Sequence, residues 1–563
     1  MRGGTGVASA FAFEDLDRTR DRLALRLRIG PDSTHCDMTY GELHSFVART
    51  AAALAAFGCK IGDRVAVLLP HSKALITTFF AVRFCGCVPS IIAWPTVKID
   101  RDKYERNLRG VVATLNATWL VTDNEMAQRF GQSFGKTKVC DISAIEGYTG
   151  FRTAAPYPGP NQPALIQFSG GTTGTQKSVP ITFDHLASQV ERYSDVLDLD
   201  ERDHFVSWLP LYHDMGLVAC LLLPFLRRLP VTVFSPIEWI MDPRPFLRSI
   251  AIDHSTLCWL PNFAFSFLAK RSSLPRGSLD LSSLRRVINC SEPIRAESMD
   301  AFLDRFRDDG LRPDALHTCY AMAEATFAVS QSTSSAPPRP MRVSTTSLGE
   351  GLLAPGPGPT RVLISCGRPL AETAIRVVDK TGEESPAGRI GEIWLKGPSV
   401  MDGYLQPADS LVPSRDAFTD GWFRTGDLGA VVDDHLYVTA RKKDVIIVGG
   451  VNVYPEDIED AVGQLATIRD GRVVALGLSN DDLGTEQLVV IAELADESIP
   501  ESVVALEAEI RTSVLAVTGI APKWVFIVPP KWIVKSTAGK ISRGDTRSRV
   551  LQQWHKLESS RKS

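Results

Sequence analysis

The sequence predicts an α/β fold, in which a large N-terminal region of mixed sheets covered by helices precedes a small α+β C-terminal region. Short apolar runs such as 64–70 (RVAVLLP) and 119–123 (WLVTD) have the length and composition of buried strands. Longer stretches such as 42–57 (ELHSFVARTAAALAAF) have helical character and alternate with these runs. This alternation favours a mixed or parallel sheet with helices packed on its faces.

The length and a change of pattern predict the division into domains. A chain of 563 residues is too long for one hydrophobic core. The segment Ser330–Thr360 is dense in Ser, Pro and Gly, which fits either a linker or an ordered insertion. Short strands follow it, and mixed helix and strand return from about Arg441. We therefore expect a large domain over 1–440 and a small one over 441–563.

The amino-acid composition argues against several classes of protein. The chain has 62 Lys and Arg against 65 Asp and Glu, so no basic excess points to nucleic acid. The ten cysteines form no Cys-x-x-Cys pair and no zinc-ligand spacing, as expected in a reducing compartment. The longest apolar run, near Val218–Leu226, is too short to span a bilayer. We expect a cytoplasmic enzyme without a membrane span.

A glycine-rich run, FSGGTTGTQKSV at 168–179, is the strongest local signal for an anion site. Glycines such as Gly174 let backbone N–H groups approach an anion, and successive N–H groups form a concave site. The hydroxyls of Thr172 and Thr173 add donors, and Lys177 adds positive charge. Apolar runs on both sides predict a loop between two strands. The spacing does not match G-x-x-x-x-G-K-[ST], which argues against a P-loop kinase or ATPase.

Further motifs follow the loop in a fixed order. They are WLPLYHDMGL (208–217), NCSEPI (289–294), CYAMAEAT (319–326), GEIWLKG (391–397), WFRTGDLG (422–429), ARKKDVIIVGGVNVYPEDIE (440–459) and STAGKISR (536–543). With the loop, they resemble the adenylate-forming superfamily of acyl-CoA synthetases, luciferases and nonribosomal adenylation domains. The likeness covers nearly the whole chain. The runs SWLPLYHDMGL, SEPIRAES and AEATFAVS are most similar to fatty acyl-AMP ligases.

The resemblance implies a fold and a reaction. The fold is that of adenylate-forming enzymes, with a small, mobile C-terminal domain. The reaction joins a carboxylate to the α-phosphate of ATP, giving an acyl-adenylate and pyrophosphate. An anion that attacks a polyanion needs positive charge and in-line positioning from the site.

Three residues match positions that act in the reaction of this family. Lys540 in AGKISR matches the adenylation lysine, whose ammonium can bridge the acyl oxygen and the α-phosphate. His213 in PLYHDMGL matches a histidine near the mouth of the acyl pocket. Lys443 falls at the hinge about which the small domain rotates between two half-reactions.

The nucleotide and metal positions also have matches. Tyr320 matches the aromatic that packs on adenine, and Ala321 stands where a glycine is usual. Asp427 matches the acid that binds both ribose hydroxyls, because a carboxylate can accept two hydrogen bonds. Arg441 matches a contact to ribose or phosphate. Glu324 matches the Mg²⁺ ligand, in keeping with the few protein carboxylates that Mg²⁺ takes.

A short segment completes the predicted nucleotide site. Ser291, Glu292 and Pro293 match the segment that lines the adenine pocket. A helix cap is the structural alternative for these three residues. ATP and Mg²⁺ are therefore the expected cofactors.

The resemblance predicts a fatty acyl-AMP ligase that passes its acyl group to the thiol of a separate acyl carrier protein. One alternative is an acyl-CoA or aryl-acid ligase with the same first half-reaction. Another is a non-catalytic acyl- or nucleotide-binding protein, which the joint presence of Lys540, Glu324, Asp427 and Arg441 disfavours. The long Ser330–Thr360 segment favours the carrier protein as acceptor, because fatty acyl-AMP ligases have an insertion there.

Overall fold

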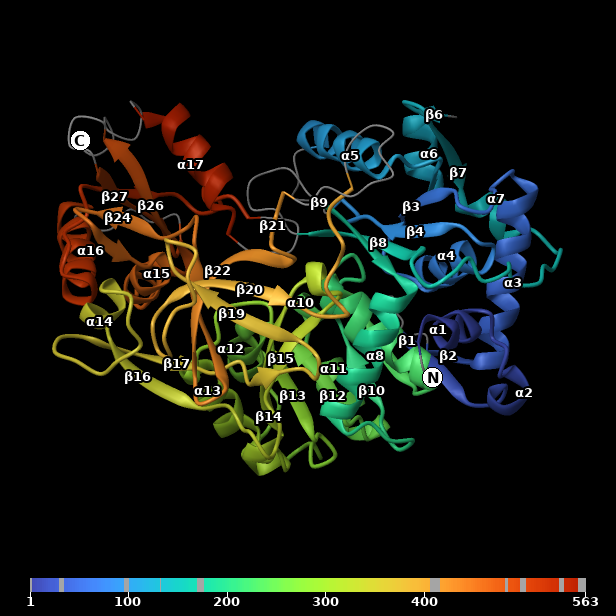
Figure 1. Ribbon diagram of the computed structural model, residues 1–563, viewed down its shortest axis with the longest axis horizontal. Helices are drawn as coiled ribbons and strands as arrows, with labels where there is room; N and C mark the ends of the chain where they lie inside the picture. The colour runs from blue at the N-terminus through green and yellow to red at the C-terminus, as the bar shows by residue number, and fades with distance from the viewer. Residues whose placement is uncertain are drawn as a thin grey trace.

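Helix-covered sheets form the body of the chain, and the C-terminal elements gather at one end of it (Figure 1). The order of strands and helices confirms the predicted α/β class. The computed structural model describes residues 3–29, 35–95, 101–131, 133–169, 177–405, 416–480, 485–496, 503–535 and 541–554.

The largest sheet has nine strands in the order β18-β15-β14-β13-β12-β10-β11-β1-β2. Neighbouring strands from β14 to β1 pair in parallel, whereas β2, β15 and β18 are antiparallel additions. The strands are β1 (Leu23–Arg28), β2 (His35–Thr39), β10 (Phe205–Ser207), β11 (Val231–Phe234), β12 (Leu257–Leu260), β13 (Arg286–Asn289), β14 (Leu316–Ala321), β15 (Ala328–Gln331) and β18 (Arg368–Pro369).

A second sheet has five strands in the order β4-β3-β5-β7-β6. The strands predicted near the N-terminus belong to this sheet, and the predicted helix lies beside it. The runs at 64–70 and 119–123 form two of its parallel strands. The stretch at 42–57 forms α3 (Tyr40–Ala56), which begins with a capping box between Thr39 and Glu42. The strands are β3 (Arg64–Leu68), β4 (Val88–Ile91), β5 (Trp119–Thr122), β6 (Ser133–Phe134) and β7 (Thr137–Asp141).

The glycine-rich run connects two antiparallel strands, β8 (Pro163–Ser169) and β9 (Lys177–Thr182), as predicted. Ser169 pairs with Lys177 at the end of this hairpin, so Lys177 is the first residue of β9. The strand thereby fixes the backbone of Lys177 beside the residues of the loop.

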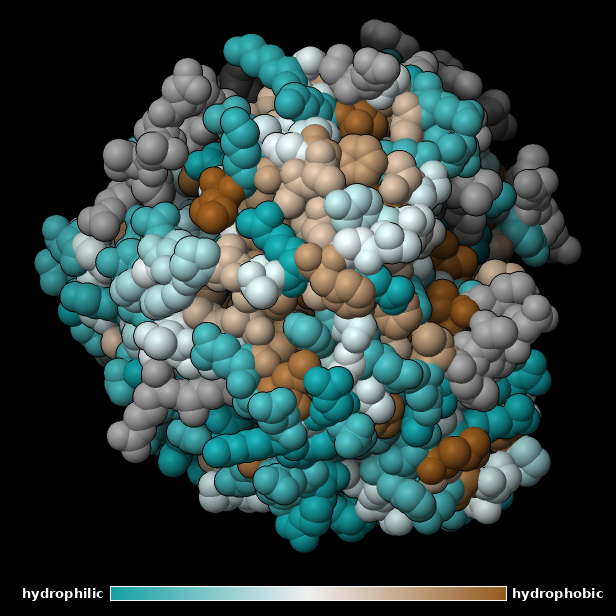
Figure 2. All heavy atoms as spheres, turned by 90° about the vertical axis from the view of Figure 1, so that its right-hand side faces the viewer, coloured by the Kyte–Doolittle hydropathy of each residue, from teal (hydrophilic) through white to brown (hydrophobic). Residues whose placement is uncertain are grey.

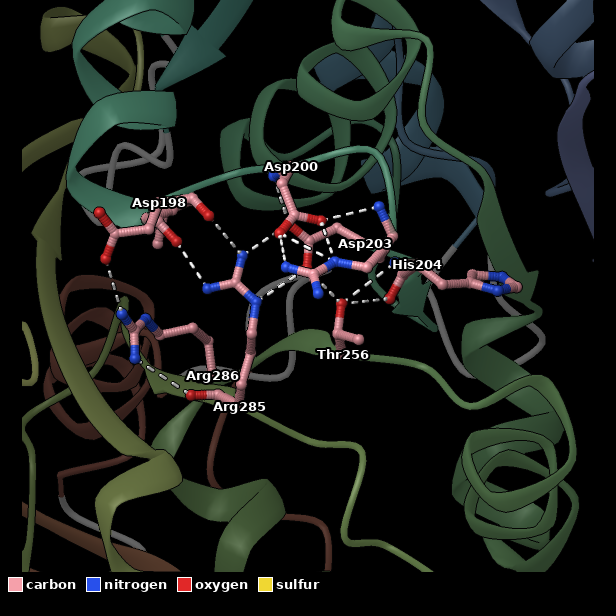
Figure 3. Close-up of polar contacts among 9 residues, drawn as sticks. Asp198, Asp200, Asp203, His204, Thr256, Arg285 and Arg286 are labelled. Atoms are coloured by element: carbon pink, nitrogen blue, oxygen red, sulfur yellow. Dashed lines mark hydrogen bonds and ion pairs between the residues drawn. The ribbon is translucent and has the colours of Figure 1, made fainter.

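The two edges of the nine-stranded sheet have different roles. At the N-terminal ends of β10, β12 and β13, Arg285 donates to Asp203 over 2.8 and 2.6 Å, and Thr256 donates to the same carboxylate over 2.8 Å (Figure 3). Arg286 reaches Asp198 at 3.3 Å. The motifs of the predicted site follow the C-terminal ends of these strands. Ligands of open α/β sheets bind at that edge.

The Ser330–Thr360 segment is ordered and has secondary structure of its own, so its interpretation as a linker is wrong. It contains β16 (Pro340–Ser344) and α14 (Thr345–Gly349), and β16 pairs with β17 (Thr360–Ile364). Buried apolar side chains from this unit pack in one cluster with side chains of the neighbouring sheet and of the C-terminal region: Val343, Leu348, Leu353, Leu363, Ala430, Tyr437, Ala440 and Tyr454.

The C-terminal region has hydrophobic clusters of its own, which are built from residues between Ile446 and Val550. They follow β22 (Trp422–Val432) and β23 (His435–Arg441), an antiparallel pair of a separate five-stranded sheet. In the described part of the chain, no helix combines the length and the apolar character needed to cross a membrane. The C-terminal elements are β24 (Ile446–Val448), β25 (Val451–Val453), α15 (Pro455–Gly463), β26 (Ile468–Asn480), β27 (Thr485–Leu494), α16 (Val503–Thr518), β28 (Trp524–Val528) and α17 (Arg543–Gln552).

Candidate active site

The buried carboxylate of Asp427 contacts two other residues that were predicted to bind the nucleotide, Tyr320 and Arg441. The hydroxyl of Tyr320 donates to Oδ2 of Asp427 over 2.7 Å, and Nε of Arg441 lies 3.2 Å from Oδ1. The aspartate and the arginine face each other across β22 and β23, while Tyr320 stands near the end of β14. Three strands thus converge on one carboxylate.

The electrostatics of this carboxylate follow from its surroundings. Burial raises the pKa of Asp427, and the charge of Arg441 and the hydrogen bond from Tyr320 oppose the rise. A carboxylate has about four lone-pair positions, so two partners leave room for further donors. The arginine side chain is 49% exposed and can also reach a ligand from the open side.

A second cluster links the predicted metal ligand to the glycine-rich hairpin. Tyr404 donates its hydroxyl to Oε1 of Glu324 over 2.7 Å, and the ammonium of Lys177 lies 4.5 Å from the centre of the Tyr404 ring. Backbone bonds support this link, because Met401 N–H donates to the Glu324 carbonyl and Leu405 N–H to the Ser178 carbonyl. The metal candidate and the loop lysine therefore share one aromatic neighbour.

The residues around Glu324 fit a Mg²⁺ ion that is held mainly by phosphates and water. Glu324 lies on a 3₁₀ turn (Ala323–Ala325) directly after β14 and is partly exposed. Within the described ranges, no group of three or more His, Cys, Asp and Glu side chains could hold a metal. Mg²⁺ sites with nucleotides commonly use only one or two protein carboxylates, so a single glutamate suits this chemistry.

The segment at 291–293 follows β13 at the C-terminal edge of the sheet. Ser291 has φ +71°, and Glu292 accepts a 3.0 Å hydrogen bond from Phe263 N–H in the first turn of α12 (Asn262–Arg271). Glu292 therefore contacts the first turn of α12, whereas the N-cap residue of the following α13 (Ala296–Phe306) is Arg295. Pro293 is exposed.

His213 precedes a buried π-helix (Met215–Leu222), and its ring centroid lies 4.8 Å from that of Tyr212. Its carbonyl accepts from Leu217 N–H over 2.8 Å. A Cβ at Gly216 would lie 2.3 Å from the carbonyl oxygen of Pro210, so only glycine allows this close approach. The glycine therefore fixes the path of the backbone next to the histidine.

Lys443 lies between β23 and β24, at the predicted hinge. Burial lowers its pKa, Asp444 opposes this, and Arg441 lowers it further. Lys177 lowers it too, so three cations from separate elements act on one region. Asp427 acts in the opposite direction, so cations and carboxylates alternate in this region.

Arg543 ties this region to the start of α17. Its guanidinium lies 3.3 Å from Asp444, 3.3 Å from Glu456 and 2.7 Å from Glu459. All four side chains are largely buried, and burial raises the pKa of Glu459 while Arg543 opposes the rise. The arginine is the last residue of the STAGKISR motif. Of the remaining predicted residues, Ala321 ends β14, whereas Thr172, Thr173, Gly174 and Lys540 lie outside the described residues.

Comparison with known proteins places this geometry in a family. The sequence pattern described as AMP-binding enzyme matches residues 12–405. The chain belongs to the AMP-binding enzyme family.

Relatives and solved structures agree with this assignment. A long-chain-fatty-acid–AMP ligase of Mycolicibacterium smegmatis is 30% identical over 577 residues, covering 92% of this chain and 90% of the relative. One of Mycobacterium tuberculosis is 30% identical over 567 residues, covering 95% and 94%. A structure from a study of fatty acyl-adenylate ligases of E. coli and L. pneumophila superposes with a TM-score of 0.88 at 26% identity, covering 98% of each chain. The predicted superfamily, its fold and an adenylate-forming ligase are thereby confirmed.

Three aromatic residues of this AMP-binding enzyme were not predicted from the sequence. Tyr404 stands in MDGYL, a run without a marked composition, and its role is visible only through its contacts with Glu324 and Lys177. Trp208, the first residue of WLPLYHDMGL, stacks on Trp239 with ring centroids 3.7 Å apart and planes 5° from parallel. The motif itself could have indicated Trp208, whereas Trp239 gave no local signal.

Proposed function

We propose that the chain activates a fatty acid with ATP and Mg²⁺ to give acyl-AMP and pyrophosphate, and then passes the acyl group to a separate acyl carrier protein. The observation that carries the proposal is the Asp427 carboxylate held between Tyr320 and Arg441. The names of the relatives support the substrate class, since both are long-chain-fatty-acid–AMP ligases.

Each of the following residues has one role in the first half-reaction. Tyr320 packs on adenine, Asp427 accepts from the ribose hydroxyls, and Arg441 contacts ribose or phosphate. Lys177 and the loop before it hold the phosphates, and Glu324 holds Mg²⁺ with Tyr404 orienting its carboxylate. Bound Mg²⁺ supplies charge that offsets the phosphate oxygens. Lys540 stabilises the negative charge that develops as the carboxylate oxygen attacks the α-phosphorus and pyrophosphate leaves.

We also propose that the boundary between the large and the small domain lies between residues 440 and 441. A small C-terminal domain that rotates about Lys443 would exchange Lys540 for the thiol of the acceptor between the two half-reactions. Separate hydrophobic clusters after residue 446 support two rigid bodies.

Contacts of the Ser330–Thr360 segment, and of the strand β17 that pairs with it, bear on the choice of acceptor. Arg361 of β17 pairs with Asp457 of α15 at 2.6 Å, and both side chains are less than 20% exposed. Tyr454 donates its hydroxyl to the Leu348 carbonyl over 3.3 Å. These contacts bridge the two proposed domains and would limit the rotation, short of the arrangement that admits free CoA but not of one that admits a carrier-bound thiol. This supports the carrier protein over free CoA.

The proposal is tested by measuring carboxylate-dependent pyrophosphate release over acids of different chain length, with CoA or a holo carrier protein added in parallel. Release with long-chain acids and loading of the carrier protein are expected. Rapid formation of acyl-CoA at the rate of adenylation would favour the CoA ligase. A lack of release with every acid would favour a non-catalytic binding protein.

Replacing Asp427 with alanine is expected to weaken ATP binding about 10- to 100-fold, because a hydrogen bond to a charged group contributes about 1.5–3 kcal/mol. Calorimetry with a non-hydrolysable ATP analogue measures the change. Asp427→Asn keeps the shape and one acceptor oxygen, so its loss should be smaller. Equal, wild-type affinity in both variants would remove Asp427 from the nucleotide site.

Breaking the bridge between insertion and C-terminal region is expected to raise acyl-CoA formation. The double variant Arg361→Ala/Asp457→Ala removes both charges and so leaves no buried ion unpaired. A gain of about 1–2 kcal/mol for the rotated state would raise CoA thioester formation roughly 5- to 30-fold. Adenylation should be unchanged. Arg342→Ala, on the exposed side of β16, is the matched control, and an equal rise in that variant would contradict the role of the bridge.

A further inference from the structure

Large apolar side chains project from two neighbouring helices at the surface. On α10 (Pro236–Met241), Ile237, Ile240 and Met241 are 55, 54 and 81% exposed, and Ile252 near the end of α11 (Arg244–Asp253) is 76% exposed. These elements and α12 lie close together in the middle of Figure 1. Exposed apolar groups gathered in one place are typical of a binding surface.

Arginine side chains lie beside these exposed apolar groups. Two shallow hollows of about 200 and 380 Å³ follow one another along α11. Ile240, Met241, Arg244 and Arg271 line the first, and Arg248 and Ile252 line the second. The only acidic side chain among the lining residues of both is that of Asp242, which Arg244 contacts at 2.8 Å. Three arginines against one aspartate give the lining of the two hollows a net positive charge.

A chain of aromatic rings connects this surface to the site. Trp239 of α10 is buried and packs against Phe267, whose ring also borders the first hollow, with centroids 5.1 Å apart. Trp239 stacks on Trp208, which belongs to the same motif as His213. Phe263 lies 6.0 Å from Trp208, and its N–H donates to Glu292. Ring contacts therefore run from the surface to Trp208 and Phe263, and a hydrogen bond continues them to Glu292.

A second group of exposed apolar side chains offers a comparison. Phe57, Ile61, Tyr148 and Phe151 are 43, 57, 39 and 68% exposed, near the end of α3 and after α7 (Ile142–Glu146). The face made by these elements shows hydrophobic side chains above a mainly hydrophilic lower part (Figure 2). It serves as a control surface, because the row of arginines belongs to α11 and α12.

We propose that the surface of α10, α11 and the end of α12 docks the protein on a membrane that contains anionic lipids. Aliphatic side chains enter the headgroup boundary, and the arginines pair with lipid phosphates. A membrane is also where a long-chain fatty acid dissolves, so this placement brings the enzyme to its substrate. The substrate argument rests on the proposed function, whereas the docking itself rests on the exposed side chains and their charge.

The test is sedimentation of the full chain with vesicles of phosphatidylcholine, alone or mixed with an equal part of phosphatidylglycerol. Wild type should bind the mixed vesicles. Ile240→Ser/Met241→Ser should weaken binding at least about tenfold, because two large apolar groups no longer leave water. Arg248→Glu/Arg271→Glu should abolish the preference for phosphatidylglycerol. Phe151→Ser, on the control surface, should bind like wild type.

The outcomes separate this proposal from the proposed function. Pyrophosphate release with a long-chain acid supplied in solution without vesicles should be equal in all variants, which also shows that they fold. The docking proposal would be overturned if the wild-type protein bound neither kind of vesicle, or if the surface variants bound vesicles as well as wild type. Loss of carrier-protein loading in the arginine variants with unchanged vesicle binding would identify the surface as a carrier-protein site instead. Absence of pyrophosphate release with unimpaired vesicle binding would overturn only the enzymatic proposal.

Discussion

Replacing Lys540 with alanine is expected to slow acyl-adenylate formation about 100- to 1,000-fold, the usual effect of removing one electrostatic contact to a transition state. The STAGKISR motif motivates this expectation, together with the charge that builds up when a carboxylate attacks a phosphate. ATP binding should change little, because Asp427, Tyr320 and Arg441 provide the contacts to the nucleoside. Mass spectrometry of the adenylate and calorimetry with nucleotide measure the two effects separately.

Lys523→Ala provides the matched control for Lys540. Lys523 is an exposed lysine of the same C-terminal region, so its loss removes an equal charge without touching the motif. Adenylate yields that fall equally in both variants would indicate a general effect of charge. A near-normal yield from the Lys540 variant alone would remove this lysine from the reaction.

Replacing Arg543 with alanine is expected to destabilise the C-terminal region by about 3–5 kcal/mol, because three buried carboxylates lose their shared cation. The deficit should shrink as the pH falls. Without the guanidinium, which opposes the effect of burial, the folded-state pKa of Glu459 lies further above its unfolded value. The folded variant then binds protons that the unfolded chain does not, so its stability decreases as the pH rises through those values.

Urea unfolding at mildly acidic and mildly alkaline pH, compared with wild type, measures this dependence. Arg543→Lys keeps the charge but not the forked geometry, and it should recover part of the lost stability. A pH-independent deficit would show that the arginine acts through packing alone. Since α17 begins at this residue, the adenylation rate of the lysine variant also reports how far the cluster positions the preceding motif.

Local patterns predicted the elements that depend on neighbouring residues. The runs at 64–70 and 119–123 became β3 and β5, and 42–57 became α3, because burial and helix capping are encoded over a few residues. The strand–loop–strand arrangement around Lys177 was predicted for the same reason. The family motifs then indicated that Tyr320, Asp427 and Arg441 belong to one site, and the structure brings their side chains into contact.

Contacts between distant segments could not be predicted in this way. Tyr404 joins Glu324 and Lys177 although 80 residues separate Tyr404 from Glu324. The interaction of Arg543 with Asp444 spans 99 residues, and although each residue belongs to a quoted motif, neither motif indicates the other as its partner. The nature of Ser330–Thr360 was undecided for a related reason. Its Ser, Pro and Gly content fits a linker equally well, and only the pairing of β16 with β17 shows an ordered unit.

The ion-pair network at the N-terminal strand ends has a consequence for protein engineering. Arg285, Asp203 and Thr256 link the N-terminal ends of β10, β12 and β13, at the edge of the sheet opposite to the predicted site. The loops at the other edge are therefore not needed to hold these strands together. Libraries that randomise the loops after β10 and β13, with the buried Trp208 and the close-packed Gly216 kept, should therefore yield many folded members. Libraries directed at 198–204 or 284–286 should yield mostly insoluble ones.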